Sequence, residues 1–400
     1  MGCTRRIIGL FAVLIIVIPL GAWAITQVKH ELNPTLTNTT PERESSNYTK
    51  LDDYMLLATK YPFLKVLLSK NKNISQSFPD AGYTVHVFAK IARERDLTDS
   101  ELKILEITLK ANECYFSKRE PPEKSYYVIS FSEKRPHEGI PYVECPNFTS
   151  RLPFVYYKGR GFQYYPVTAT NWAYFYLKRG MNEDAEAILK EMLPLMEVEE
   201  TNNLTVGLFK VYFSPPGGSS YIPWISSFSQ GMLAGLYAWL YNETGNRSYL
   251  QVAQLIFNSF YMPAEEKGFV ENTSYGLWFL EYPCKRDFLI LNGHIITLKG
   301  LWLYYNFTED ERAEELFWKG VESVEKALPD CDTGSWSLYA VNSSPAREDY
   351  HRLHINLLVW LYAKTEREIF LEYAKKWNDY LREKGLEEED IEALLRQTQN

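Results

Sequence analysis

Hydrophobic and polar positions follow one recurrent design beyond residue 167. A helical run of apolar residues ends in an aromatic or aliphatic pair, a short polar turn follows, and a second amphipathic helix begins. Four stretches share this design: 176–193, 240–257, 303–320 and 361–378. Their spacing of roughly sixty residues, with short strand-like pieces such as LFKVYFS, YGLWFLEYP and SWSLYAV between them, predicts a closed or nearly closed ring of helix pairs.

The pattern before this repeat changes twice. Residues 51–113 hold helix-like periods, and in LTDSELKILEITLKANE Thr98 can cap a helix with Glu101 three residues on. Between residues 115 and 166, β-branched and aromatic runs broken by Pro and Gly indicate a small β-rich region. The predicted fold class is therefore mainly α: an α/α toroid of about four helical hairpins (167–386) after a smaller helical and then β-rich region (51–166), with a C-terminal tail (387–400).

The first 29 residues predict a membrane anchor. From Ile7 to Val28 the chain carries no charge, which is long enough to span a bilayer, and Arg5 and Arg6 would stay on the cytoplasmic side. A cleaved signal peptide ending near Ala24 is the alternative. Residues 30–50 are polar and read as a flexible stalk, so we expect the rest of the chain outside the cytoplasm, on a single-pass anchor or secreted.

Sequons for N-glycosylation support export. They occur at Asn38, Asn47, Asn73, Asn147, Asn203, Asn242, Asn246, Asn272, Asn306 and Asn342. Such a surplus fits a glycosylated, externally facing surface.

Four of the five cysteines lie after the anchor. We predict disulfides Cys114–Cys145 and Cys284–Cys331, because each would join segments of one part of the chain; the alternative is four buried thiols. The chain has no CxxC pair, which argues against structural zinc.

Composition and net charge limit the classes of binding partner that the protein can have. A chain that is 46% hydrophobic and 15% aromatic can bury a large core, and its many tyrosines either fill that core or stack on sugar rings. The net charge of −8 argues against a nucleic-acid partner, although basic spots remain at 158–160, 178–179 and 285–286.

Four loops of the predicted ring combine polar and aromatic groups. They read GFQYYP (161–166), PWISSFSQG (223–231), EYP with LNG (281–283 and 291–293), and DTGS through DYHRLHIN (332–335 and 349–356). This ordered set resembles the C-terminal catalytic domain of D-glucuronyl C5-epimerases, in a membrane-anchored prokaryotic-type form, over residues 160–385.

The resemblance implies an isomerase that converts D-glucuronate to L-iduronate residues in a heparan-type polysaccharide or glycan. It implies Glu281, Tyr339 and Tyr350 as catalytic groups, and leaves open which is the base. Substrate-binding residues implied by the matching loops, or chosen as arginines that could hold the uronate carboxylate, are Tyr165, Trp224, Gln230, Tyr282, Asn292, Arg347, Arg352 and His354. A disulfide between Cys284 and Cys331 would hold the Glu281 and Tyr339 loops in register. The resemblance requires no cofactor and is compatible with a homodimer.

The chemistry is consistent with these residue types. Epimerisation removes the proton α to a carboxylate and returns one to the opposite face, so it needs two acid–base groups and a donor or cation at the carboxylate. Family members usually carry an Arg shortly after the tyrosine of the DTGS segment, whereas this chain reads Tyr339-Ala-Val-Asn. Arg347, Arg352 or Arg286 are the candidates to replace it.

Other interpretations stay open from the sequence. A lyase shares the proton abstraction, and a non-catalytic glycan-binding protein could keep the cleft. Glu281 could instead form an ion pair with Arg286, and His351 and His354 could belong to a capped structural cluster with Asp349 at the N-cap; without a third His or an HExxH frame they do not predict a metal site.

Overall fold

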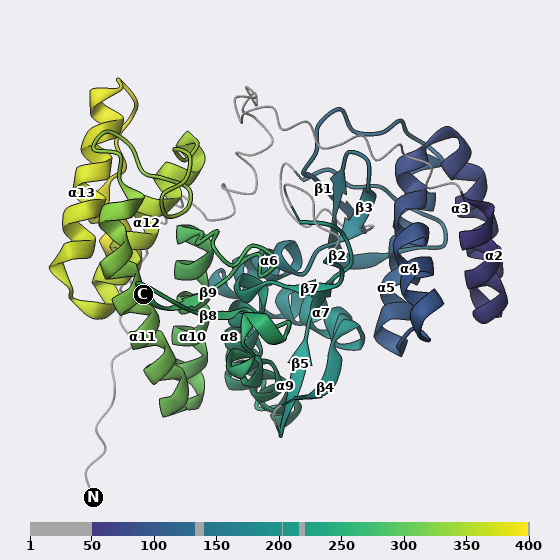
Figure 1. Cartoon of the computed structure of the whole chain (residues 1–400), viewed down its shortest axis with the longest axis horizontal. Coiled ribbons are helices and arrows are strands. Elements are labelled where there is room, and N and C mark those ends of the chain that lie inside the picture. The colour runs from purple at the N-terminus through teal and green to yellow at the C-terminus, as the bar shows by residue number, and fades with distance from the viewer. Residues whose placement is uncertain (1–49, 133–139, 202, 216–220, 399–400) are drawn as a thin grey trace, which may run out of the picture.

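The computed structural model describes residues 50–132, 140–201, 203–215 and 221–398 (Figure 1). The chain is mainly helical, as predicted. The predicted anchor, its signal-peptide alternative and the stalk up to residue 49 lie outside the described residues. Within the described ranges, no helix combines the length and apolar character that a membrane crossing requires.

The N-terminal region begins with four helices, drawn in purple and blue in Figure 1. They are α2 (Leu51–Lys60), α3 (Lys65–Ser77), α4 (Tyr83–Glu94) and α5 (Asp99–Phe116). The predicted capping box is confirmed, because the Thr98 side chain accepts from the backbone N–H of Glu101 while the Glu101 carboxylate accepts from that of Thr98.

A three-stranded antiparallel sheet follows and confirms the predicted β-rich stretch. Its strands are β1 (Tyr127–Phe131), β2 (Ser150–Tyr157) and β3 (Gly161–Tyr164), in the order β1-β2-β3. The buried amide of Asn112 on α5 donates to the carbonyl of Phe162 and accepts from its N–H, at 2.8 and 2.9 Å. Together with the Cys114–Cys145 disulfide, which is as predicted, this pair of bonds fixes the sheet to α5.

The second predicted disulfide is wrong. Cys284 and Cys331 are not joined by a disulfide, and Cys331 is completely buried among apolar neighbours. Burial raises the pKa of the Cys331 thiol to about 12, so it remains protonated at neutral pH. The loops of Glu281 and Tyr339 are therefore held in register by other means, among them the antiparallel bridge between Ile290 and Ala340.

Four consecutive helical hairpins confirm the repeat seen in the sequence. They are α6 (Pro166–Lys178) with α7 (Asn182–Met192), α8 (Ser227–Thr244) with α9 (Arg247–Phe257), α10 (Leu291–Thr308) with α11 (Glu311–Ala327), and α12 (Glu348–Thr365) with α13 (Glu368–Glu383). The first helix of each hairpin packs on the first helix of the next, in the order α6, α8, α10, α12. A last helix, α14 (Ile391–Thr398), lies in the predicted C-terminal tail and packs on α12.

Three of the hairpins turn by the same side-chain chemistry. Thr244, Thr308 and Thr365 each donate a hydroxyl to the carbonyl four residues earlier at 2.7 Å and accept from the backbone N–H two residues later. The residue between is left-handed: Gly245 in one turn, Glu309 and Glu366 in the others. The threonine side chain thus satisfies backbone groups left over at the helix end, which explains the recurrent polar turn.

Helices α8 and α10 pack backbone against backbone. A Cβ on Gly300 would stand 2.1 Å from the carbonyl carbon of Gly231, and one on Gly235 would stand 2.7 Å from the carbonyl oxygen of Gly300. Both helices are buried over most of their length. Their glycines allow the two backbones to touch, which brings the first turns of the two helices, and the loops before them, close together.

Short strands connect the hairpins. They form the pairs β4 (Glu197–Thr201) with β5 (Leu204–Leu208), β6 (Lys210–Val211) with β7 (Trp224–Ile225), and β8 (Val270–Thr273) with β9 (Gly276–Phe279). Short 3-10 turns complete the chain at Pro62–Leu64, Pro79–Gly82, Leu193–Leu195, Asn258–Tyr261, Ala264–Glu266 and Leu328–Cys331. The strand-like SWSLYAV piece differs from expectation, because it forms isolated bridges rather than a strand.

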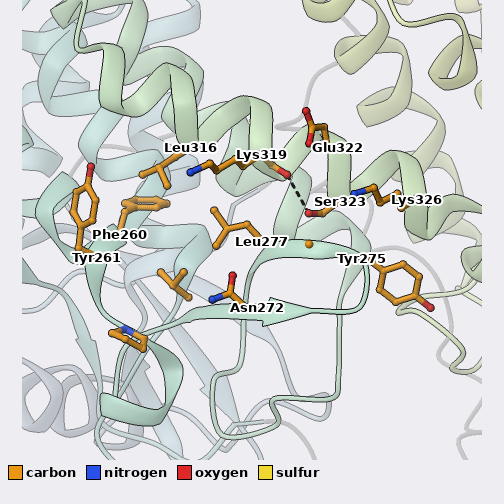
Figure 2. A pocket seen from close by; sticks show the side chains of 13 residues that line it. Phe260, Tyr261, Asn272, Tyr275, Leu277, Leu316, Lys319, Glu322, Ser323 and Lys326 are labelled. Atoms are coloured by element: carbon orange, nitrogen blue, oxygen red, sulfur yellow. Dashed lines mark hydrogen bonds between the residues drawn. The ribbon is translucent and has the colours of Figure 1, made fainter.

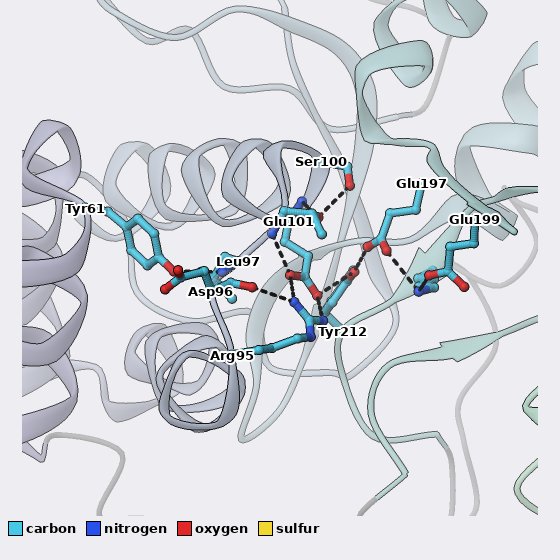
Figure 3. A network of polar contacts seen from close by, with 11 residues as sticks. Tyr61, Arg95, Asp96, Leu97, Ser100, Glu101, Glu197, Glu199 and Tyr212 are labelled. Carbon is cyan, nitrogen blue, oxygen red and sulfur yellow. Dashed lines mark hydrogen bonds and ion pairs between the residues drawn. The ribbon is translucent and has the colours of Figure 1, made fainter.

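A buried polar network joins the N-terminal helices to these connections (Figure 3). Arg95 donates two hydrogen bonds of 2.6 Å to the carboxylate of Glu101, and the single hydroxyl hydrogen of Tyr212 is shared between the carboxylates of Glu197 and Glu101. Lys210 completes the network through Glu197 at 2.9 Å. Because each buried acid has a cationic or hydroxyl partner, the network fixes the helical region against β4 and β6.

Candidate active site

The carboxylate of Glu281 is buried in the loop between β9 and α10. Glu281 is 8% exposed, and its Oε2 has no hydrogen-bond partner. Burial raises the pKa of Glu281 from 4.5 to about 7, and a hydrogen bond from Tyr282 opposes that rise. The predicted alternative, an ion pair with Arg286, is wrong, since Arg286 donates two hydrogen bonds of 2.6 and 2.7 Å to Glu271.

A glycine makes room for this carboxylate. Gly293 is the third residue of α10, and a Cβ built on it would stand 2.4 Å from Oε2 of Glu281. The first turn of α10 therefore lies directly against the carboxylate. Asn292, the preceding residue, is 3% exposed, and its side-chain oxygen also has no partner.

Six tyrosines surround Glu281. For each of them, burial raises the pKa of the phenol first, and the negative charge of Glu281 raises it further. We call this set the tyrosine cluster: Tyr126, Tyr157, Tyr165, Tyr282, Tyr339 and Tyr350. Its members come from the β-sheet region, from the turn before α6, from the loops before α10 and α12, and from the first turn of α12 itself.

The cluster is held together by ring contacts and hydrogen bonds. The rings of Tyr339 and Tyr350 meet edge to face at 4.8 Å, and their hydroxyls are hydrogen-bonded. Tyr165 and Tyr282 share a second hydrogen bond, and the ring of Trp224 packs 5.3 Å from that of Tyr282. These contacts restrict the orientation of each phenol around the carboxylate.

The tyrosines of the cluster and Glu281 differ in their protonation states at neutral pH. Every tyrosine of the cluster has a pKa above its ordinary value, so all six stay protonated at neutral pH. Glu281, with a pKa of about 7, exchanges its proton near neutrality. One group that can accept a proton thus lies among several that can donate one, which is the pairing that proton transfer to and from carbon needs.

Two predicted binding residues, Trp224 and Gln230, are buried and form hydrogen bonds within the fold. Trp224 is 1% exposed and donates its ring N–H to the carbonyl of Phe213 at 2.7 Å, and this bond fixes the ring that packs on Tyr282. Gln230 does not fit the predicted substrate contact. Its completely buried amide donates to the carbonyl of Gly207 and the hydroxyl of Ser259 and accepts from the N–H of Phe209, which uses both amide hydrogens.

The arginines differ in their placement. Arg347 lies 5.2 Å from the ring centre of Tyr350 and pairs with Asp349 at 2.5 Å, so it stands at the edge of the cluster. Arg352 instead forms ion pairs with Glu348 and Glu389 at 2.9 and 2.8 Å. These pairs direct its guanidinium toward the segment before α14, and the predicted contact of Arg352 with substrate is not supported.

His354 also belongs to a structural set. Its Nδ1 lies 3.0 Å from the Ser337 hydroxyl, which contacts Nδ1 of His351 at 2.7 Å. Both rings are fully buried, and burial lowers the pKa of His354 to about 3 and that of His351 to about 4, so both are neutral. The predicted N-cap role of Asp349 is wrong, because α12 begins at Glu348 and Arg347 is its N-cap.

Sequence reasoning missed Tyr126 and Tyr157. Both lie in the β-rich region before the repeat, where the pairs Tyr126-Tyr127 and Tyr156-Tyr157 looked like ordinary strand residues. Tyr126 has a positive φ of 62°, an unusual backbone for a tyrosine just before a strand. Nothing in the sequence indicates that backbone, so only the structure reveals these two members of the cluster.

A separate groove lies along the β8–β9 hairpin (Figure 2). It has a volume of about 460 Å³ between that hairpin and α11, and its lining includes Phe260, Tyr261, Leu316 and Lys319. No residue of the tyrosine cluster lines it. Across the described ranges, no group of three or more His, Cys, Asp or Glu side chains is arranged to hold a metal ion.

Comparison with known proteins identifies the matched region. The family model described as D-glucuronyl C5-epimerase C-terminus matches residues 202–379. An uncharacterized protein of Methanocaldococcus jannaschii is 33% identical over 210 residues, which are 51% of this chain and 67% of that protein. The D-glucuronyl C5-epimerase of Caenorhabditis elegans is 29% identical over 186 residues, which are 42% of this chain and 29% of the worm enzyme.

Solved structures align over a larger part of the chain at low similarity. A glycosyl hydrolase family 88 protein from Bacteroides vulgatus aligns over 85% of this chain and 86% of its own, with a TM-score of 0.38 and 10% identity. A family 76 mannosidase from Bacteroides thetaiotaomicron aligns over 85% and 88%, with a TM-score of 0.29 and 11% identity.

Proposed function

The chain belongs to the D-glucuronyl C5-epimerase family, and from that premise we propose that it inverts C5 of D-glucuronate residues in a polysaccharide or glycan, giving L-iduronate-type residues. The observation that carries the proposal is the buried carboxylate of Glu281, with a pKa of about 7, among protonated phenols. Epimerisation at carbon requires a base beside an acid, because one group must take a proton from the carbon and another must return one.

Glu281 is the base in this proposal. Its carboxylate takes the C5 proton of the glucuronate residue, and the electron pair of the broken C–H bond moves into the sugar carboxylate to form an enediolate. About half of the Glu281 side chains are ionised near pH 7, so the base is available at neutral pH. The Oε2 atom of Glu281 has no hydrogen-bond partner, so it can accept the proton.

Tyr350 is the acid that reprotonates C5 from the opposite face. Burial and the charge of Glu281 raise the pKa of Tyr350, while the positive charge of Arg347 lowers it. Tyr350 is thus protonated but lies beside a cation that stabilises its phenolate after transfer. Tyr339 is hydrogen-bonded to Tyr350, so it stabilises the same phenolate and completes the predicted catalytic set.

Tyr165, Tyr282 and Asn292 remain the proposed sugar contacts. Tyr165 and Tyr282 belong to the cluster, and the partnerless oxygen of Asn292 lies in the first turn of α10. Such phenols and an amide oxygen can hydrogen-bond sugar hydroxyls. The proposal requires no organic cofactor, because the electron pair rests on the substrate carboxylate.

We also propose that the four hairpins form an α/α toroid. The rings of Tyr174 on α6 and Trp360 on α12 both lie over Nζ of Lys299 on α10, at 4.7 and 5.9 Å. Helix α6 of the first hairpin and helix α12 of the last hairpin thus approach the same lysine. This arrangement supports a closed ring of hairpins. A site at one end of such a ring suits a long glycan chain.

We also propose that the protein is exported and glycosylated. The eight sequon asparagines within the described residues are all exposed: Asn73, Asn147, Asn203, Asn242, Asn246, Asn272, Asn306 and Asn342. A buried asparagine could not accept a glycan, so this distribution supports a surface that faces outward. Anchoring through residues 7–28 completes the proposal.

The decisive experiment follows hydrogen at C5. The purified full chain is incubated in deuterium oxide with glucuronate-containing oligosaccharides, and NMR reads deuterium at C5 and iduronate signals. Both should appear with the wild type and be lost in Glu281→Gln and Tyr350→Phe. An unsaturated product absorbing in the ultraviolet would identify a lyase instead, and binding without any exchange would identify a glycan-binding protein.

A further inference from the structure

The reaction needs a positive group at the sugar carboxylate, and the usual arginine is missing from the segment after Tyr339. We propose that Arg160, in the turn between β2 and β3, binds the carboxylate of the uronate residue that reacts. This inference rests on the proposed function and deepens it, because it names the residue that selects an acidic sugar.

Arg160 lies beside the tyrosine cluster. Its guanidinium carbon stands 5.8 Å from the ring centre of Tyr157, and its positive charge opposes the rise in the Tyr157 pKa that burial causes. The pKa of Tyr157 is also raised by the charge of Glu281, and Tyr157 is electrostatically coupled to Tyr350, so all of these groups lie near one another. A sugar carboxylate near Tyr157 would therefore be within reach of both Arg160 and the acid–base pair.

Arg160 differs from the other candidate arginines in its partners. Arg286, Arg347 and Arg352, the three arginines predicted as replacements, each have a carboxylate partner. Among the residues that the structure describes, Arg160 forms no ion pair. A half-buried guanidinium without an acid beside it, next to a cluster that holds a buried acid, is suited to receive an anion from outside.

The turn that carries Arg160 is rigidly held. The carboxylate of Asp80 accepts from the N–H of Gly159 at 2.9 Å and from the hydroxyl of Tyr156 at 2.7 Å. The buried side chain of Gln163 donates to the carbonyl of Arg160 at 2.6 Å.

The neighbouring Gly161 has a positive φ of 68° and touches Asp80 and Asn112 so closely that no Cβ would fit. Because the backbone on both sides is fixed, Arg160 needs little reorganisation to bind an anion.

A carboxylate contact of this kind affects the chemical step as well as binding. The carboxylate gains charge when C5 loses its proton, so a guanidinium that forms two hydrogen bonds with it becomes a stronger partner in the transition state. Loss of Arg160 should therefore lower kcat and also raise KM. A residue that only contacts a neighbouring sugar would change KM alone.

The test compares two charge variants with a matched control. Arg160→Gln should lower kcat/KM for C5 exchange by about 100-fold, and Arg160→Lys, which keeps the charge but not the planar fork, should fall between. Arg119→Gln is the control, because Arg119 also lies over a tyrosine ring, that of Tyr115 at 6.0 Å, and forms no ion pair within the described residues. It should leave exchange unchanged.

A second measurement separates charge recognition from general damage. Wild type should bind a glucuronate oligosaccharide more tightly than its carboxyl-reduced counterpart, and Arg160→Gln should lose that preference while binding the reduced sugar as before. The inference is wrong if Arg160→Gln keeps the preference, or if Arg347→Gln alone loses it. If Arg160→Gln does not fold, as judged by circular dichroism, Arg160→Met, which also removes the charge, decides by the same two criteria.

The failure of the proposed function has a different signature. In that case the wild type itself neither exchanges hydrogen at C5 nor distinguishes the two sugars, and the inference falls with it. A wild type that exchanges normally, with an Arg160→Gln variant that does so too, overturns this inference only.

Discussion

Gly293 lies directly against the carboxylate of Glu281. A Cβ at this position would stand 2.4 Å from Oε2 and 2.9 Å from the Cβ of Glu281, while the glycine itself has an ordinary helical backbone. Space rather than conformation therefore explains the glycine. The first turn of α10 and the acid are complementary in shape, and the glycine of the tripeptide LNG provides the necessary space.

Gly293→Ala should displace the Glu281 carboxylate without unfolding the protein. The added methyl cannot coexist with Oε2, so the acid must rotate away from its place in the cluster. We expect C5 exchange to fall at least tenfold, because a misplaced base loses its alignment with carbon. The measurement is the exchange rate by NMR, with the melting temperature as the check on folding.

Gly320→Ala provides the matched control. It adds the same methyl to helix α11, where the nearest atom is the end of the flexible Leu298 side chain at 2.3 Å. That side chain can move, so exchange should stay within twofold of wild type. Equal losses in both variants would mean that the effect of Gly293→Ala is general strain.

The rate of C5 exchange should rise with pH and level off above about 7. Burial raises the pKa of Glu281 to about 7, and only the ionised carboxylate can accept the C5 proton. A pH series of kcat/KM from 5 to 9 checks this. A rate that stays flat across neutrality would exclude Glu281 as the base.

Burial of Glu281 should also make stability depend on pH. The folded pKa is raised from 4.5 to about 7, so the folded state binds more protons than the unfolded state between these values. The stability of the protonated form is fully present below about pH 4.5 and is lost as pH rises through 7, at a cost of about 3 kcal/mol.

Glu281→Gln has no charge to bury and removes this dependence. Urea unfolding measures the free energy of unfolding of both proteins at pH 5 and pH 8. The difference, variant minus wild type, should be larger by about 3 kcal/mol at pH 8 than at pH 5. A constant difference between the two proteins at both pH values would contradict the raised pKa.

Tyr126→Phe and Tyr127→Phe should have different effects although the residues are neighbours. The phenol of Tyr126 senses the charge of Glu281, whereas that of Tyr127 senses Arg119. Removing the Tyr126 hydroxyl takes a donor from the cluster and should lower C5 exchange about tenfold. Tyr127→Phe should keep the wild-type rate, and equal rates for the two variants would remove Tyr126 from the site.

The cysteines allow a test of the corrected pairing. Cys145→Ser opens the bond to Cys114, which closes a loop of 31 residues, and should lower the free energy of unfolding by about 3 kcal/mol. Cys284→Ser should leave it within about 0.5 kcal/mol. A comparable loss in Cys284→Ser would restore the Cys284–Cys331 disulfide; unfolding with and without reductant measures both.

Periodic features of the chain were predictable from sequence. The hairpins, the Thr98 cap and the β-rich region follow from local pattern and turn chemistry, because each depends on residues close in the chain. The pairing of Cys114 with Cys145 is of the same kind, since both lie in one compact region.

Contacts between distant segments were not predictable. The direction of Gln230 into the fold, and the commitment of Arg352 to Glu389, depend on partners far along the chain. Tyr126 and Tyr157 join Glu281 only because the sheet packs against the helical hairpins. A single sequence contains no periodic pattern that reports such long-range contacts. The family resemblance therefore identified Glu281 but not all of the tyrosines around it.

The tyrosine cluster also has a consequence for how the protein is made. Tyr126 leaves the ribosome early, whereas Tyr350 follows only after three of the four hairpins have been synthesised. A partly made chain therefore has the sheet and most helices but an incomplete ring of phenols around Glu281. Because domains tend to fold as they emerge, the last hairpin both ends folding and completes the site, so that truncated chains that escape quality control should be inert toward glycans.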